Sequence, residues 1–386
     1  MNHAFRLSLL FALQFAALGL YLPFFPLWLA DRGFAASEIS LILAVPVIVR
    51  VASTPIIADR AGRSGRLKGA MIVLSAGALA SFGLVTVQSG FWPVLVTVSV
   101  FSALYAAILP LSESLAMRGV REFGHDYGRM RLWGSAAFIA ANIGGGALIE
   151  RYGPPASGPG IALLLCALLV AALLLPGDAR AKVTVPAGLA GLRRWTIPAD
   201  LVPLIVAAAL IHASHAVYYG FGTLGFEREG IDNTTIGLLW ATGVAAEIVL
   251  FAAAGLLFAR RSARLLIAAG AAGALLRWAA MAFAPAALTL FALQTLHAFS
   301  FALTHYAIVR AIGLRLEGEQ AVRVQGLNSA LAALIMGLAM AAAGPLYAAF
   351  GLKAYLGPAL LALFGLLALC FQPHRADAGG SSSEPS

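Results

Sequence analysis

The sequence predicts an all-α membrane protein with twelve transmembrane helices arranged in two six-helix halves. Hydrophobic residues make up 61% of the 386-residue chain, and charged residues only 11%. A soluble domain has about 45–50% apolar and about 25% charged residues, so this composition excludes a soluble globular enzyme and a disordered chain. With roughly 20 apolar residues per crossing and short connections, a chain of this length holds about twelve helices. The alternating segments typical of an outer-membrane barrel are absent.

Apolar runs separated by short polar turns predict each helix in order. The first half contains the expected spans 5–30, 37–58, 67–88, 92–118, 128–150 and 158–176. The second half contains the expected spans 200–226, 233–258, 263–284, 286–312, 322–349 and 354–372. The first run follows the basic Arg6 and lacks a small-residue cleavage site after it, so we expect a retained helix rather than a cleaved signal.

A long polar break divides the chain. It covers residues 177–199 and separates an N-terminal six-helix bundle, 1–176, from a C-terminal one, 200–372. Residues 373–386 are rich in glycine and serine, a composition that predicts a disordered tail.

Basic residues predict the orientation, because lysine and arginine concentrate on the cytoplasmic side of membrane proteins. With the N-terminus inside, 20 of the 26 basic residues fall in cytoplasmic segments and four in outer turns: Arg32, Arg151, Arg228 and Lys353. We therefore expect both termini in the cytoplasm, with the bilayer rather than nucleic acid as the partner of the basic surface. We also expect a monomer.

Two six-helix halves joined by a cytoplasmic linker are typical of a transporter whose site lies between the halves near mid-membrane. The chain has no G-x-x-x-x-G-K-[ST] loop, so transport driven by ATP is not expected. A membrane sensor or an intramembrane enzyme remains an alternative. A sensor needs a sizeable soluble domain, and an enzyme needs a nucleophile–base pair or a metal set, neither of which the sequence offers. No cofactor is expected.

Five charged residues fall inside the expected spans or at the mouth of one, where an isolated charge costs at least about 2.5–3.5 kcal/mol. They are Arg50, Glu113, Arg131, Glu247 and Arg277. Static ion pairs that hold helices together are one interpretation. Because the charges are spread over helices two, four, five, eight and nine, we favour a central cavity in which they bind substrate or couple transport.

Two polar stripes accompany these charges. His212, His215 and Tyr219 share one face of the seventh helix by their spacing, and Gln294 and His297 begin a similar stripe on the tenth. Hydrogen-bonded packing is the plain alternative for each histidine. A zinc or haem pair at His212 and His215 is not expected, since no further ligand cluster accompanies it.

Glu247, Arg277 and His297 form the expected proton-coupling centre. They place an anion, a permanent cation and a titratable imidazole on helices eight, nine and ten. We expect Arg277 to hold either Glu247 or a substrate carboxylate, so that competition between the two links binding to protonation.

The turn after the second helix resembles the signature loop of the major facilitator superfamily. Asp59, Arg60, Gly62 and Arg63 match that loop, whereas Pro55 stands where its leading glycine belongs. Residues 126–135 (DYGRMRLWGS), 21–24 (YLPF), 212–221 (HASHAVYYGF) and 277–278 (RW) resemble the 3-phenylpropionic acid transporter group. That group is related to oligosaccharide/proton symporters such as lactose permease.

The resemblance implies a major facilitator fold in a bacterial-type inner membrane and a cytoplasmic gate at the signature loop. It implies proton-coupled uptake of a small organic acid such as 3-phenylpropionate, with sugar or nucleoside uptake and drug efflux as alternatives. His297 matches the permease's tenth-helix histidine, but Ser300 stands where the permease has its proton-releasing glutamate. Glu247 therefore becomes the expected proton carrier. Glu113 and Arg131 match a sugar-contacting pair and become expected substrate or gating groups.

Overall fold

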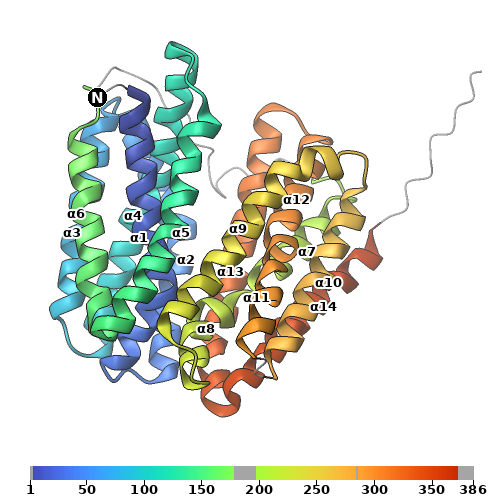
Figure 1. Cartoon of the computed structure of the whole chain (residues 1–386). Coiled ribbons are helices and arrows are strands. Elements are labelled where there is room, and N and C mark those ends of the chain that lie inside the picture. The colour runs from blue at the N-terminus through green and yellow to red at the C-terminus, as the bar shows by residue number, and fades with distance from the viewer. Residues whose placement is uncertain (1–2, 178–196, 284–285, 373–386) are drawn as a thin grey trace, which may run out of the picture.

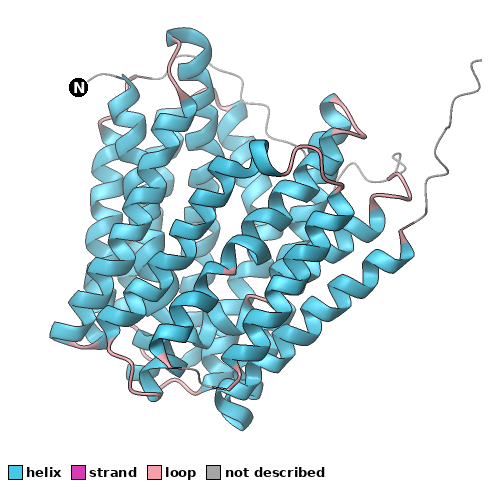
Figure 2. Ribbon diagram, turned by 45° about the vertical axis from the view of Figure 1, so that its right-hand side comes forward, coloured by secondary structure: helices cyan, strands magenta, loops and turns pink. Residues whose placement is uncertain are grey.

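A computed structural model describes residues 3–177, 197–283 and 286–372, and its long elements in these ranges are all helices (Figure 2). The first half contains α1 (His3–Asp31), α2 (Ala36–Arg63), α3 (Leu67–Val87), α4 (Phe91–Phe123), α5 (Tyr127–Tyr152) and α6 (Ser157–Leu173). Nearly all of the expected linker, 177–199, and the whole expected tail, 373–386, lie outside the described residues.

The second half contains more helices than crossings. They are α7 (Val202–Ala213), α8 (Ala216–Arg228), α9 (Asn233–Leu257), α10 (Ala263–Met281), α11 (Ala287–Thr295), α12 (Thr304–Gly313), α13 (Gly318–Phe350) and α14 (Leu356–Ala368). The described residues form eleven helical stretches apolar and long enough to cross a membrane. The last one, Gly318–Phe371, has 54 residues, far more than the 20 or so that one crossing needs. It crosses twice, because the positive φ of Gly351 (55°) ends α13 and lets the chain turn. The predicted fold is confirmed.

The seventh expected helix, 200–226, is not continuous. It is interrupted at Ser214 and His215, between α7 and α8. The Ser214 hydroxyl donates to the Ile211 carbonyl at 2.6 Å, and the His215 ring nitrogen Nδ1 lies 3.0 Å from the His212 carbonyl. These side chains compete with backbone N–H groups for the carbonyls, which is how serine and similar residues loosen a helix.

The tenth expected helix, 286–312, is also irregular. Residues Ala298–Leu303 form a π-helical segment between α11 and α12. The hydroxyl of Thr304, the first residue of α12, donates to the Phe299 carbonyl of this segment at 3.2 Å. Interruptions of this kind inside membrane helices occur where backbone lines a site, and π-bulges are frequent at functional sites. Both irregular segments belong to the second half, and they contact each other.

The two halves meet at one end and diverge toward the end that carries the N-terminus (Figure 1). At the closed end α2 packs on α13 and α5 packs on α9. Gly146 and Gly237 allow the second contact: a Cβ atom on either would lie 2.3 or 2.4 Å from a carbonyl oxygen of the other helix. Small residues permit this approach of backbones in membrane helices. If the N-terminus is cytoplasmic, the structure is closed outside and open inside.

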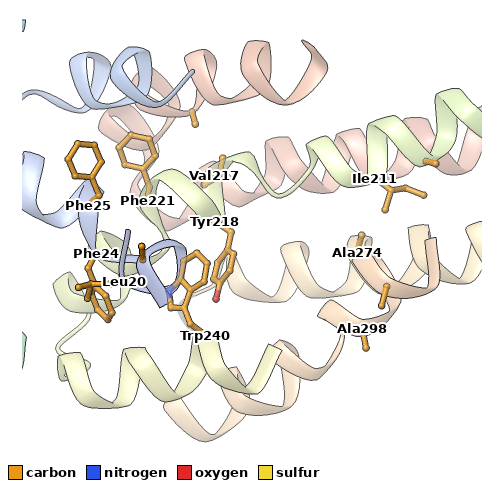
Figure 3. Close-up of a cluster of buried hydrophobic side chains, with 14 of the residues drawn as sticks. Leu20, Phe24, Phe25, Ile211, Val217, Tyr218, Phe221, Trp240, Ala274 and Ala298 are labelled. Carbon is orange, nitrogen blue, oxygen red and sulfur yellow. The ribbon is translucent and has the colours of Figure 1, made fainter. Parts of the chain in front are cut away.

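Further contacts hold the two halves together at the closed end. Ser40 of α2 donates to the Ala341 carbonyl of α13 at 3.2 Å, and the Glu150 carboxylate of α5 accepts from the Asn233 backbone N–H of α9 at 2.7 Å. Leu20 and Phe24 of α1 belong to the same buried cluster as Trp240 and the α8 aromatics (Figure 3). The helices of the two halves therefore share one apolar core at this end. At the start of α9, hydrogen bonds from Thr235 hold the pKa of the Asp232 carboxyl below its usual value.

Candidate functional site

A cavity of about 360 Å³ lies between the two halves. Its first-half wall comes from α1, α2 and α4, and its second-half wall from α7, α8, the π-helical segment, α12 and α13. This volume is within the usual range for small-molecule sites, about 300–1,000 Å³. Of the residues predicted to bind substrate, three line it: Arg50, His212 and Tyr219.

Arg50 is the charged group of this cavity. It is partly buried on α2, and the described residues provide neither a carboxylate within ion-pairing distance nor a hydrogen-bond acceptor for it. Arg50 interacts electrostatically with the phenol of Tyr21, which is no anion at neutral pH. A guanidinium at membrane depth is costly without an anionic partner or water. The cavity therefore offers an unmatched positive charge.

Aromatic rings and thioethers form much of the remaining wall. Tyr21, Tyr219, Phe301, Met336 and Met340 line the cavity. Tyr21 is held by a stacked contact with Phe25, 4.6 Å between ring centroids, and Phe301 lies 5.2 Å from the His212 ring. Methionine is adaptable and contacts aromatic rings favourably. These walls suit a flat apolar group next to a charged one.

Arg277 lies behind the cavity wall rather than in it. The residue is 0% exposed and does not line the cavity. Its Nη2 donates to Gln294 Oε1, and its Nη1 lies 3.1 Å from His297 Nδ1. Its guanidinium carbon lies 4.3 Å from the centroid of the Trp278 ring and 4.8 Å from that of Tyr218. Cation–π contacts with these rings therefore stabilise the buried positive charge. Gln294 is likewise 0% exposed and lies outside the cavity.

His297 separates Arg277 from Glu247. The His297 Nε2 atom lies 3.5 Å from Glu247 Oε2, while no ion pair joins Glu247 to Arg277 among the described residues. An arginine can only donate, so Nδ1 of His297 must accept and its Nε2 carries the proton that faces Glu247. The three residues lie together, but the expected direct contact between Arg277 and Glu247 is replaced by a chain of contacts through the imidazole.

His215 and His212 connect the two irregular helices. The His215 Nε2 atom lies 3.2 Å from the Ser300 hydroxyl, and His212 Nε2 lies 3.4 Å from the Phe301 carbonyl. His215 is 0% exposed and does not reach the cavity, whereas His212 does. Within the described ranges no group of three or more His, Cys, Asp or Glu side chains could hold a metal ion.

Glu113 and Arg131 lie outside this cavity. The Arg131 guanidinium packs over the Phe15 ring at 4.0 Å and interacts electrostatically with both Glu113 and Glu247. Arg131 of the first half thus interacts with Glu247 of the second half. The expected gate residues lie at the C-terminal end of α2, where Arg63 pairs with Asp59 on the same helix. Arg60 and Gly62 complete that last turn of α2.

Two polar cavity residues, Ser102 and Asn328, are absent from the residues expected from the sequence. Ser102 of α4 and Asn328 of α13 line the cavity and are 9% and 6% exposed. Both are neutral and lie in long apolar helices, where a single serine or asparagine is common enough to pass unnoticed. An uncharged amide inside an expected apolar span, at its seventh residue, is the signal that could have found Asn328.

Comparison with known families shows which proteins this chain is similar to. Residues 4–354 match the family model described as MFS_1 like family. A protein from Escherichia coli named "Probable 3-phenylpropionic acid transporter" is 31% identical over 373 residues, which is 94% of either chain. The maltose permease of Geobacillus stearothermophilus is 34% identical over 146 residues, 37% of this chain and 36% of the permease.

Solved structures share the fold at low sequence identity. The nucleoside transporter NupG has a TM-score of 0.79 and 15% identity, covering 96% of this chain and 98% of that chain. A bacterial homologue of the human lysosomal transporter Spinster, in an inward-facing and unoccupied conformation, has a TM-score of 0.72 and 13% identity. The match covers 96% of this chain and 95% of the homologue.

Proposed function

Because this chain belongs to the MFS_1 like family and is thus a membrane transporter rather than an enzyme, we propose that it takes up a small aromatic carboxylate together with protons. The relative named as a probable 3-phenylpropionic acid transporter supports the aromatic acid as substrate. The halves would move against each other around the central cavity, as in other repeat-built transporters. We place the chain in a bacterial inner membrane as a monomer, with both termini in the cytoplasm.

One observation carries the substrate proposal: Arg50 has no carboxylate partner among the described residues, and it stands in a largely apolar cavity whose wall includes the rings of Tyr219 and Phe301. A carboxylate would supply the missing partner through a bidentate, charge-assisted pair. The substrate ring would lie against Phe301 and Tyr219. A neutral sugar or nucleoside would leave the Arg50 charge uncompensated, so this observation favours an acid over the sugar and nucleoside alternatives.

Proton coupling is proposed to run through Glu247, His297 and Arg277. While Arg277 donates to His297 Nδ1, the imidazole stays neutral and its Nε2–H points at Glu247. Displacement of Arg277 when the acid binds at Arg50 would free Nδ1 to accept a proton, and the resulting imidazolium would face the Glu247 carboxylate. Protonation and substrate binding would thus require the same movement.

Uptake into proteoliposomes tests the proposal. Purified protein should accumulate labelled 3-phenylpropionate when the outside is acidic, and accumulation should collapse when a protonophore removes the gradient. Arg50→Gln should lose binding of the acid, because the amide keeps much of the shape but not the charge. If the proteoliposomes take up a labelled sugar or nucleoside but no aromatic acid, the proposed substrate is rejected. Acid uptake unaffected by the gradient would reject the coupling.

A further inference from the structure

Asn328 is a buried polar group that neither the proposed carboxylate site nor the coupling chain uses. Its side chain lines the central cavity and is 6% exposed. Its Oδ1 atom is buried and has no hydrogen-bond partner among the described residues. An amide in such a position costs free energy unless something that enters the cavity bonds to it. The position of Asn328 relative to Arg50 indicates what that would be.

Packing of α2 against α13 gives this relative position. A Cβ atom on Gly337 would lie 2.5 Å from Ile48 and 3.5 Å from the Ala44 carbonyl, so Gly337 is level with about position 46 of α2. The two helices run in opposite directions, and Asn328 is nine residues nearer the cytoplasm than Gly337. Asn328 is therefore level with about position 55, five residues beyond Arg50, which is a rise of about 7–8 Å along the helix.

We propose that Asn328 binds a hydroxyl group at the end of the substrate remote from its carboxylate, and that the transporter prefers ring-hydroxylated phenylpropionate-type acids over unsubstituted ones. The proposal rests on the proposed function, since Arg50 must hold the carboxylate. An acid with a three-carbon side chain and one ring has the length to reach from Arg50 to the level of Asn328. A hydroxyl at the far edge of its ring would meet the amide.

A hydroxyl is the group that fits this amide best. It can donate to Oδ1 and accept from Nδ2, so it satisfies either orientation of the side chain. A second carboxylate fits less well, because Arg50 is the one arginine or lysine that lines the cavity in the described part of the chain. An unsubstituted ring would leave Oδ1 without a partner.

The test compares two competitors of matched shape against uptake of labelled 3-phenylpropionate by wild-type proteoliposomes. One is 3-(4-hydroxyphenyl)propionate and the other is 3-(4-methylphenyl)propionate, in which a methyl group replaces the hydroxyl. A site that hydrogen-bonds a hydroxyl discriminates strongly against an analogue without it. We therefore expect the hydroxy acid to inhibit at a concentration at least about tenfold lower than the methyl acid does. Equal inhibition by the two acids overturns the proposal.

Variants assign the preference to the residue. Asn328→Leu should remove the difference between the two competitors, measured as the ratio of their inhibitory concentrations. Asn328→Ser should retain part of the preference for the hydroxy acid. This variant replaces Asn328→Leu in the test if the leucine variant does not fold. Thr242→Val is the matched control, because the Thr242 hydroxyl donates to a carbonyl of its own helix away from the cavity. A preference that survives in Asn328→Leu shows that another group reads the hydroxyl.

The outcomes separate this proposal from the one on which it rests. If neither acid inhibits and the labelled acid is not taken up, the proposed carboxylate substrate is wrong. If all three acids are bound with similar affinity, the carboxylate site stands and the role of Asn328 is rejected.

Discussion

His297 is the residue on which the two charged members of the coupling centre depend. Its two ring nitrogens face different partners, Arg277 at 3.1 Å and Glu247 at 3.5 Å. Since Arg277 cannot release a proton, only the imidazole and the carboxylate can change their charge. In the proposed coupling, Arg277 would control which nitrogen is free, and Glu247 and His297 would hold the proton.

We expect Glu247→Gln to abolish uphill accumulation while downhill exchange continues. The glutamine keeps a partner for His297 Nε2 but cannot be ionised, so binding is no longer linked to a protonation step. The measurements are accumulation under an imposed pH gradient and exchange without one. Wild-type accumulation by this variant would place the coupling elsewhere, with Glu113 as the next carboxylate to test.

Arg277→Lys should impair coupling more than it impairs substrate binding. A planar guanidinium bonds Gln294 and His297 at once, whereas an ammonium is a compact point charge that suits this geometry poorly. We expect gradient-driven uptake to fall by about tenfold or more, because the variant loses one charge-assisted hydrogen bond and the free energy of such a bond corresponds to a factor of this size. The affinity for the acid, measured by equilibrium binding, should change much less. A loss of affinity as large as the loss of uptake would mean that Arg277 binds the substrate directly.

Helix interruptions and glycine contacts act at the scale of whole elements. The break between α7 and α8 and the π-helical segment beside α12 bring His215 and Ser300 within 3.2 Å of each other. At the outer end the Gly146 and Gly237 contact sets how closely α5 and α9 approach. The helix interruptions position the residues of the candidate site, and the glycine contact holds the two halves together at the closed end of the molecule.

Gly237→Val should destabilise the outer-closed state. A side chain there would press on the Asn142 carbonyl, and overpacking of this kind costs about 1–3 kcal/mol. That shifts the equilibrium toward the outward-facing state by about 5- to 150-fold. Labelling of Ser40→Cys from outside would report it, in a background without Cys166 and Cys370, because Ser40 is buried in the closed contact.

Gly83→Val is the matched control for this experiment. A Cβ atom on Gly83 would meet nothing within 4 Å, so this variant should label like the parent. Equal labelling of the Gly237→Val variant and the parent would show that the α5–α9 contact does not hold the outer side closed.

The molecule as a whole is asymmetric along its long helices, since its halves separate toward the end that carries the N-terminus and meet at the opposite end (Figure 1). In this state Asp59 pairs with Arg63 of its own helix. In the proposed transport cycle, the opposite state must bring the separated ends of the halves together, and their basic turns with them. Asp59 is then available to pair with basic groups and hold the inner side closed.

Asp59→Asn should therefore slow exchange while leaving substrate affinity nearly unchanged. The asparagine cannot form the ion pairs that the closed inner side needs, and the residue lies outside the cavity. Exchange rate and equilibrium binding, measured on the same preparation, check this expectation. Equal losses of both would assign Asp59 a role in folding or in the site itself.

The sequence by itself determined the fold, and it singled out the charged residues of the proposed coupling centre. Apolar runs long enough to span a bilayer, the polar break and the distribution of basic residues depend only on the order of residues, so twelve crossings in two halves followed from them. The charges Arg50, Glu247 and Arg277 were visible for the same reason, because an ionised group inside an apolar run is costly wherever it points.

Only the tertiary structure decided which of these groups reach the cavity. Direction around a helix axis and contacts between helices depend on packing, which hydropathy does not contain. His297 therefore proved to lie between Arg277 and Glu247, Arg277 proved to be buried behind the wall, and Asn328 became apparent as an unpaired amide. The interruptions at Ser214 and beside Thr304 were hidden too, because side-chain competition for backbone carbonyls leaves the hydropathy of a span unchanged.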